Sequence, residues 1–154
     1  MPDPVSRATV EAFYAAYVSG DPARIDAMLD ENVEWHVTGP VDVIQVCGSW
    51  QGRAAVTERF ARLVPRVISS RKLEIEYLLI DGDKSALFGR MTYRHCASGR
   101  TISHRTSHIV HYRAGKVVYF RVVSDSFDAA EQFLGHRLEV GGDDSSARGE
   151  FVAV

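Results

Sequence analysis

The chain has 154 residues, which favours one domain, and its apolar share of 45 % and charged share of 25 % are ordinary for a globular protein. Its formal net charge of -2 argues against a nucleic-acid partner, because phosphate binding requires a clear basic excess. No apolar stretch approaches the roughly 20 residues that a membrane span needs, and no secretory leader is apparent. We therefore expect a cytoplasmic protein without a membrane partner.

Two helices and a strand are predicted in the first part of the chain. Residues 5–19 carry apolar side chains at helical spacing, with Ser6 as the N-cap. A second helix begins after Asp21, and its apolar stripe extends to Leu29. Residues 33–38 alternate apolar and polar side chains, which is typical of a strand.

A loop over residues 39–52 leads to a third predicted helix over 52–67, which Pro65 is expected to end. This loop is unusually apolar, so it either forms a lid or packs against the sheet edge or a partner subunit. Residues 71–125 indicate four strands joined by hairpin turns. Residues 126–135 predict a short closing helix.

Helices followed by hairpin-connected strands indicate an α+β fold in which the sheet buries one face against the helices. We expect a single domain over residues 1–136. The remaining segment, 137–154, is polar and contains glycine, so we expect a mobile tail. A strongly bent sheet wrapped on helices would leave a cavity on its concave side.

Three separated stretches resemble the nuclear transport factor 2-like superfamily, and within it the SnoaL-like branch. They are "YAAYVSGDPARIDAMLDENVEWHV", "GSWQGRAAVTERF" and "RAGKVVYFRVVSDSFD", and the matching element order covers roughly residues 7–135. The resemblance implies a cone-shaped fold, with a bent, mostly antiparallel sheet wrapped on three N-terminal helices and a pocket in the cone. It also implies a homodimer, which we expect to form through the outer sheet face. Outward side chains that suit such an interface are Arg90, Thr92, Arg94 and Arg121.

The superfamily includes ketosteroid isomerases, limonene-epoxide-type hydrolases, polyketide cyclases, dehydratases and carriers. An isomerase of this type needs a carboxylate base, an acidic hydroxyl and a protonated carboxyl. The matching positions here hold Trp35, Phe13 and His108. For the epoxide hydrolases, the resemblance implies a mechanism in which two aspartates bridged by an arginine activate a water molecule. The matching positions hold Met91 and Val122 in place of the aspartates and Gly89 in place of the arginine. We therefore expect neither mechanism, while the acidic residue of the cyclases has no assigned counterpart in this sequence.

Strand alternation, set in the register of the resemblance, indicates which side chains face the pocket. Expected ligand-binding residues are Phe13, Tyr14, Trp35, Met91, Tyr93, His104, Thr106, Phe120 and Val122. The same alternation turns His95 and Val118 inward. Such a wall is mostly apolar with few polar groups, which is typical of a small-molecule site, although each aromatic ring also suits plain core packing.

His108 is the main catalytic candidate, because an imidazole in an apolar cone can act as a general acid or base near neutral pH. A buried, hydrogen-bonded structural histidine is the alternative. Asp125 is the second candidate, since it either caps the closing helix or orients a pocket histidine. His104 and His108 would lie about 13 Å apart on a strand, too far for one ion, so we expect no metal and no cofactor.

Two functions remain open at this point. The first is a cofactor-independent isomerase, cyclase or dehydratase that acts on a hydrophobic small molecule, with His108 as the proton shuttle. The second is a non-catalytic ligand-binding or carrier module of the same fold, which the shortage of carboxylates in the expected pocket favours. We favour the enzyme.

Overall fold

The computed structural model describes residues 2–139, so most of the expected mobile tail lies outside the described residues. The elements in chain order are α1 (Arg7–Ser19), α2 (Pro22–Asp26), β1 (Leu29–Val37), β2 (Gly48–Gln51), α3 (Arg53–Glu58), the π-helical segment η1 (Arg59–Leu63), α4 (Val64–Val67), β3 (Ile68–Asp81), β4 (Lys84–His95), β5 (Thr101–Arg113), β6 (Lys116–Ser124) and α5 (Ser126–Leu134). The described chain contains no helix long and apolar enough to cross a membrane.

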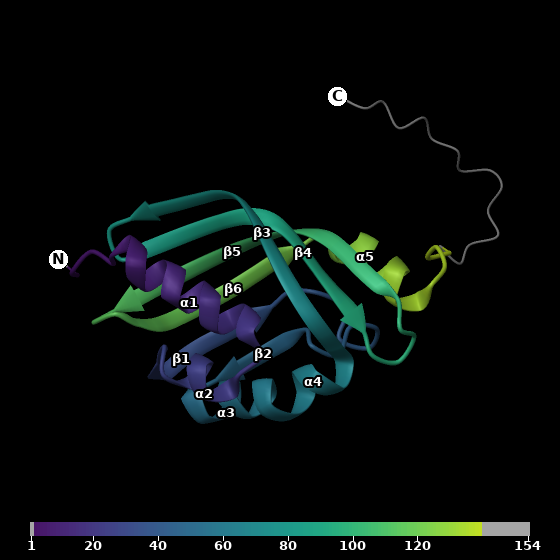
Figure 1. Ribbon diagram of the computed structural model, residues 1–154, viewed down its shortest axis with the longest axis horizontal. Helices are drawn as coiled ribbons and strands as arrows, with labels where there is room; N and C mark the ends of the chain where they lie inside the picture. The colour runs from purple at the N-terminus through teal and green to yellow at the C-terminus, as the bar shows by residue number, and fades with distance from the viewer. Residues whose placement is uncertain (1, 140–154) are drawn as a thin grey trace.

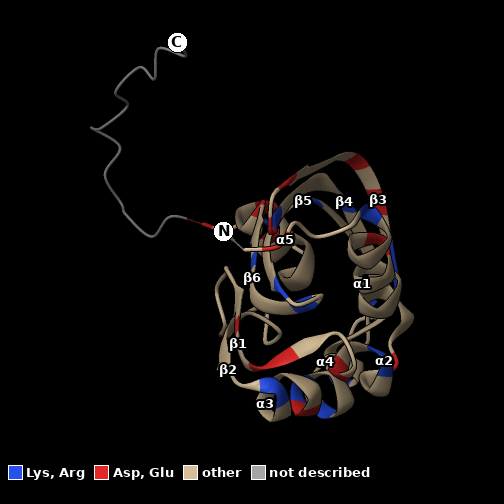
Figure 2. Cartoon of the chain, turned by 90° about the vertical axis from the view of Figure 1, so that its left-hand side faces the viewer, with Lys and Arg blue, Asp and Glu red and all other residues tan. Residues whose placement is uncertain are grey.

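One sheet carries the six strands in the order β2-β1-β6-β5-β4-β3. Neighbouring strands are antiparallel except β1 and β6, which run parallel. The sheet is open and curled, with α1 lying across it and α3 and α4 beside the β1–β2 edge (Figure 1). Figure 2, which looks along the curl, shows acidic and basic residues interspersed along α3. The predicted α+β class and mostly antiparallel sheet are confirmed.

The first helix has the bounds that its sequence predicts, whereas the second is shorter. Ser6 caps α1, and Gly20 ends it with a φ of 73°, a conformation that favours glycine. Of the apolar residues beyond α2, Met28 lies in the turn that follows the helix and Leu29 begins β1. The Met28 carbonyl accepts a hydrogen bond from the Val117 amide at 2.9 Å, and Leu29 pairs with Val117 in β6. Sheet pairing therefore overrides the helical spacing of these side chains.

The third helix continues past Pro65, which corrects the predicted end. The preceding turn is π-helical, and the Val64 amide donates to the Arg59 carbonyl five residues back. This wider turn leads into the last short helix, α4, where Pro65, which has no N–H to donate, lies in the first turn. The chain stays helical to Val67 and enters β3 directly at Ile68, several residues earlier than predicted.

Strand β2 lies inside the segment that was predicted to be a loop. Its four residues pair with Glu34–Val37 of β1, and half of them are exposed. A strand this short lacks the long alternation that identifies strands in a sequence. A second correction concerns β6, where the pairing with β5 shifts between His111 and Tyr112. The shift turns Val117 inward in place of Val118, because a bulge reverses the alternation of side chains.

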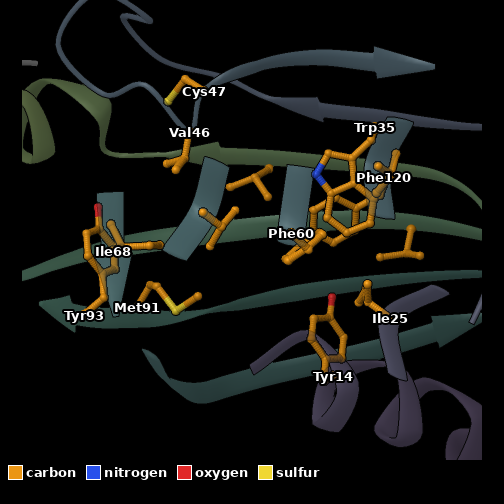
Figure 3. Packing of buried hydrophobic residues seen from close by; sticks show 14 of the residues in the cluster. Tyr14, Ile25, Trp35, Val46, Cys47, Phe60, Ile68, Met91, Tyr93 and Phe120 are labelled. Carbon is orange, nitrogen blue, oxygen red and sulfur yellow. The ribbon is translucent and has the colours of Figure 1, made fainter. Parts of the chain in front are cut away.

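The core between the sheet and the helices has an aromatic end. The rings of Trp35 and Phe120 stack with centroids 3.9 Å apart, and Phe13 and Phe60 meet Trp35 edge-on. Figure 3 shows Trp35, Phe120 and Phe60 gathered at this end, while Tyr93 lies at the opposite end of the cluster. Trp35, Phe13 and Phe120 have no exposed surface, so this cluster anchors α1 and the helix after β2 to the sheet.

Candidate functional site

A cavity opens at the end of the core opposite the aromatic cluster. It holds about 520 Å³ of empty space, part of which is open to solvent. The side chains around it come from α1, the end of β1, the loop before β2, the start of β3, strands β4 to β6 and α5. They are Tyr17, Val37, Thr38, Ile44, Val46, Cys47, Ile68, Met91, Tyr93, His104, Thr106, His108, Val122, Ser124, Ser126 and Ala129. None of them carries a carboxylate, an ammonium or a guanidinium group.

The structure brings part of the predicted site together. The predicted residues that line the cavity are Met91, Tyr93, His104, Thr106, His108 and Val122. The other predicted pocket residues are buried outside the lining, in the adjacent core: Phe13, Tyr14, Trp35 and Phe120. Strand alternation predicts the face on which a side chain lies but not its depth along the cone. Whether these residues bind a ligand stays a prediction.

Tyr93 and His104 form a hydrogen-bonded pair in the cavity wall. The Nδ1 atom of His104 lies 3.1 Å from the Arg105 carbonyl oxygen, and its Nε2 atom lies 3.0 Å from the Tyr93 hydroxyl. A carbonyl only accepts, so Nδ1 carries the proton, and Tyr93 donates to Nε2 of the neutral ring. Burial lowers the pKa of His104, which favours this neutral form. The Tyr93 oxygen is therefore left with lone pairs to offer to a ligand.

His108 lies deeper and has less polar surroundings. Only 1 % of its surface is exposed, and the rings of Tyr14, Tyr17 and Phe120 lie within 5.6 Å between centroids. Its Nδ1 atom is buried and has no hydrogen-bond partner in the described part of the chain. Burial lowers the pKa of His108 to about 3, and the nearby His104 acts in the same direction. His108 is therefore neutral at physiological pH.

Asp125 stands outside the cavity and caps α5, one of its two predicted roles. Its carboxylate accepts a hydrogen bond from the Asp128 amide at 3.3 Å, and its side chain is exposed. The Asp128 and Asp125 carboxylates raise the pKa of His104 and so oppose part of the effect of burial. His95, which was expected to face the pocket, instead bonds Ser98 at 2.8 Å near the strand end.

Hydroxyl groups that the sequence analysis missed lie near the end of β6. Ser124 lines the cavity two residues after Val122, and its Oγ lies 3.1 Å from Oγ1 of Thr106. Alternation from Val122 points to the same face, so this residue was predictable. Ser126, at the start of α5, was not, because its position depends on how the helix turns back over the sheet.

The apolar loop between β1 and β2 covers one side of the cavity. Ile44, Val46 and Cys47 are buried and line it. Buried Arg59 donates from Nη2 to the Val46 carbonyl at 2.7 Å, which ties the loop to the helix. Burial raises the pKa of Cys47 to about 11, so its thiol is protonated at neutral pH. The loop therefore forms part of the cavity wall within one chain. Its predicted movement as a lid stays a prediction.

No cluster of three or more His, Cys, Asp and Glu side chains in residues 2–139 is arranged to hold a metal ion. The polar chemistry of the cavity consequently rests on two neutral imidazoles and several hydroxyls. These groups can orient a ligand by hydrogen bonds, and an imidazole can also accept a proton if charge develops beside it.

The sequence matches the family model of the SnoaL-like domain over residues 10–120. The chain belongs to the SnoaL-like family. No curated protein matches it. Among solved structures, this SnoaL-like chain resembles a protein of Rhodopseudomonas palustris provisionally described as an isomerase. The two share 26 % identity with a TM-score of 0.76, over 83 % of this chain and 97 % of the other.

Two further structures share the fold of this SnoaL-like chain at lower identity. TerC, co-crystallised with polyporic acid, has 23 % identity and a TM-score of 0.71, over 82 % of this chain and 96 % of TerC. An LEH-like epoxide hydrolase of M. tuberculosis has 17 % identity and a TM-score of 0.67, over 83 % and 88 % of the two chains. An NTF2-like protein of Burkholderia thailandensis also shares this fold, at 22 % identity and a TM-score of 0.69, over 81 % of this chain and 94 % of the other. The expected SnoaL-like branch is confirmed by the family model.

Positions that matched the hydrolase aspartates hold Met91 and Val122, and both line the SnoaL-like cavity. The matched arginine position holds Gly89, where an added Cβ would overlap the Glu74 carbonyl oxygen. The backbone therefore leaves no room for an arginine side chain there. A water held between two carboxylates, as that mechanism requires, has no counterpart in this lining.

Proposed function

We propose that this SnoaL-like protein binds an apolar small molecule in the cavity and moves a proton within it, without a metal or other cofactor. Isomerisation, cyclisation and dehydration are the reaction types that fit this description. The observation that carries the proposal is His108, a neutral imidazole in a lining without charged side chains, with a ring nitrogen that has no hydrogen-bond partner among residues 2–139. An unpaired buried nitrogen costs about 1 to 3 kcal/mol, and such a cost is typical of functional sites.

The low pKa of His108 limits when it can act. In the empty cavity the imidazole is a weak base, because burial disfavours its charged form. A ligand that becomes anionic beside it raises its pKa, since the opposite charge stabilises the imidazolium. His108 therefore takes up a proton only as negative charge develops on the ligand.

The Tyr93–His104 pair suits a positioning role in the same proposal. The phenol proton is committed to Nε2 of His104, so the Tyr93 oxygen accepts and does not donate. A ligand hydroxyl or N–H group is its matching partner. The rest of the wall selects by shape, because apolar side chains specify little else. That TerC was co-crystallised with polyporic acid supports a small-molecule ligand for this fold.

A carrier is the second candidate, and one observation favours it. None of the lining side chains is a carboxylate, the usual strong base for removing a proton from carbon. A carrier would hold its ligand unchanged, with the two histidines serving only as hydrogen-bonding groups. The two functions differ in whether bound ligand exchanges protons with solvent.

Deuterium exchange separates enzyme from carrier. A panel of apolar ketones is incubated with the protein in D2O, and loss of the α-proton signals is followed by NMR. We expect exchange with the wild-type protein and a loss of about 100-fold or more in His108→Gln, the range for removing a general base. His136→Gln, which changes an exposed histidine, is the matched control and should exchange normally.

Two outcomes would contradict the proposal. Exchange that survives in a folded His108→Gln variant removes His108 from the chemistry. Ketones that bind the wild-type protein without any exchange favour the carrier instead. Binding of the same ketones, followed by their chemical-shift changes, distinguishes that result from an unsuitable panel.

A further inference from the structure

One buried and one half-buried arginine lie near the end of α1 without a carboxylate partner among the described residues. Arg59 is 7 % exposed and Arg71 is half-buried, and each packs over aromatic rings. In residues 2–139 no Asp or Glu oxygen lies within 4.0 Å of either guanidinium, and no carboxylate influences the pKa of either residue. Buried charges in proteins are normally paired, so these two cations require an explanation.

The surroundings of Arg59 explain its position. It donates to the Val46 carbonyl at 2.7 Å and lies 4.5 Å from the centre of the Trp50 ring. Arg71 has no comparable partner. Its guanidinium makes no hydrogen bond or ion pair with the other described residues and lies 5.7 Å above the Tyr17 ring and 5.5 Å from the Phe60 ring. Burial lowers the pKa of Arg71, which means that the charged form is held at a cost.

Arg71 lines a second cavity, which is separate from the one described above. This groove holds about 700 Å³ of space including its open side, and its lining shares only Ile68 with the first cavity. It lies between the end of α1, the η1–α4 helix and the start of β3. The lining residues are Val18, Ser19, Gly20, Phe60, Val64, Pro65, Ile68, Ser69, Ser70 and Arg71. Arg71 is the one charged member, and the floor is apolar.

The backbone at the groove is shaped around Arg71. Strand β3 shifts its pairing with β4 between Ser69 and Lys72, which takes Ser70 and Arg71 out of the regular ladder. Ser70 has a φ of 52°, a left-handed conformation that serine seldom adopts. Gly20 lies beside the guanidinium, because a Cβ added there would be in van der Waals contact with Nη2 of Arg71, at 3.6 Å. The groove at this irregular pairing is thus lined by a cation and two serines.

We propose that this groove binds the carboxylate of a small organic acid, with Arg71 as the main contact. A guanidinium matches a carboxylate through two parallel N–H···O bonds. Ser69 and Ser70, which also line the groove, supply hydroxyl groups near it. The single positive charge matches a monoanion better than a doubly charged phosphate ester. Apolar Phe60 and Val64 suit an aromatic or aliphatic body on the acid. The proposal uses none of the residues on which the proposed function depends.

Calorimetric titration with three matched probes tests the site. Benzoate carries the carboxylate, benzamide has the same shape without charge, and phenyl phosphate carries the larger charge. We expect benzoate to bind at least about tenfold more tightly than benzamide, and Arg71→Gln to remove that difference. Arg66→Gln changes an exposed arginine of the same region and should leave benzoate affinity within about twofold.

Amide chemical shifts locate the binding. Benzoate should move the signals of Gly20, Ser69 and Ser70 and leave those of Thr106 and Val122 unchanged. Shifts at the latter two instead, unchanged benzoate affinity in Arg71→Gln, or no binding at millimolar concentrations would each overturn the proposal. Tighter binding of phenyl phosphate would overturn the choice of a carboxylate. If Arg71→Gln does not fold, Arg71→Lys serves, since it keeps the charge but loses the paired hydrogen bonds and should weaken benzoate binding.

Discussion

His108 is held in its neutral form by the residues around it. Three aromatic rings surround the imidazole, and none of the cavity-lining side chains carries a negative charge that would stabilise a proton on it. Burial therefore lowers its pKa to about 3, far below the ordinary value of about 6.5. The same surroundings that make His108 a weak base in the empty cavity also link its titration to the stability of the fold.

The free energy of unfolding should fall as the pH drops from about 6.5 toward 3. In that window the unfolded chain binds a proton at His108 and the folded chain does not, so acid favours unfolding. His108 changes the free energy of unfolding by at most about 1.4 kcal/mol per pH unit in this window. Urea unfolding at successive pH values measures it, and His108→Phe, which keeps an aromatic ring and removes the titration, should flatten the curve.

The exposed His136 provides the control for this effect. His136→Gln, which changes an exposed histidine, should show the wild-type dependence of unfolding on pH. The difference between the two variants isolates His108 from His104, whose pKa is also lowered by burial. A slope that is the same in His108→Phe and in the wild-type protein would mean that the imidazole is hydrated in solution.

The sequence predicts which side chains of a strand face the concave side of the sheet, but not how deep in the cone each one lies. Met91, Thr106 and Val122 line the cavity as strand alternation predicts. Trp35 and Phe120 have the same inward orientation, yet they stack on each other in the core. Depth depends on where helix α1 closes the cone, and that depends on packing between distant segments. Alternation within one strand contains no information about it.

Gly89 is required at the element scale, because strands β3 and β4 approach closely there. It faces the concave side, and an added Cβ would overlap the Glu74 carbonyl oxygen. The pairing of β3 with β4 shifts between Ile75 and Tyr77, immediately beyond this point. Such shifts bend a strand, so the missing side chain at Gly89 lets the sheet curl around the helices.

Gly89→Ala should therefore destabilise the protein by about 2 to 3 kcal/mol, the usual cost of forcing extra atoms into a packed region. Gly115→Ala is the matched control. Gly115 has open space around it and a φ of 73°, so alanine there meets only the strain of a left-handed backbone, about 1 kcal/mol. Urea unfolding at neutral pH compares the two. Equal decreases in the free energy of unfolding in the two variants would show that β3 moves aside at Gly89 without cost.

The hairpin strands were predictable as elements, whereas the helical connections were only partly so. Long alternating runs identified β4, β5 and β6, since each has a buried face and an exposed face. The end of the third helix was missed, because Pro65 is tolerated after a π-helical turn that no sequence rule locates. Leu29 was assigned to a helix because its spacing fits one, and pairing with β6 decides otherwise.

At the scale of the whole molecule, the outer face of the sheet carries exposed apolar side chains. Two cross-strand rows run over β3 to β6: Tyr77, Phe88, Ser107 and Val123 form the first, and Leu79, Ala86, Ile109 and Arg121 the second. Tyr77 and Leu79 are 64 % and 66 % exposed, and Val123 is 49 % exposed. Several exposed apolar side chains on one sheet face are typical of a protein interface.

We propose that two copies of the chain pair through these rows, as the expected homodimer requires. Ile109 is 40 % exposed and lies near the middle of the second row, beside Arg121 of the neighbouring strand. Ile109→Lys would bury a charge in the interface, next to another positive charge. We expect it to weaken the dimer by about 100-fold, the effect of disrupting a central interface residue.

Sedimentation equilibrium at micromolar concentrations measures the association. Val41→Lys is the matched control, because Val41 is an apolar residue with 50 % exposure in the loop before β2, away from the outer face. That variant should associate like the wild-type protein. A monomeric wild-type protein would contradict the dimer, and an Ile109→Lys dimer of unchanged affinity would contradict this face. The cavity opens on the concave side and the rows lie on the convex side, so the loss of association should leave ligand binding in the cavity intact.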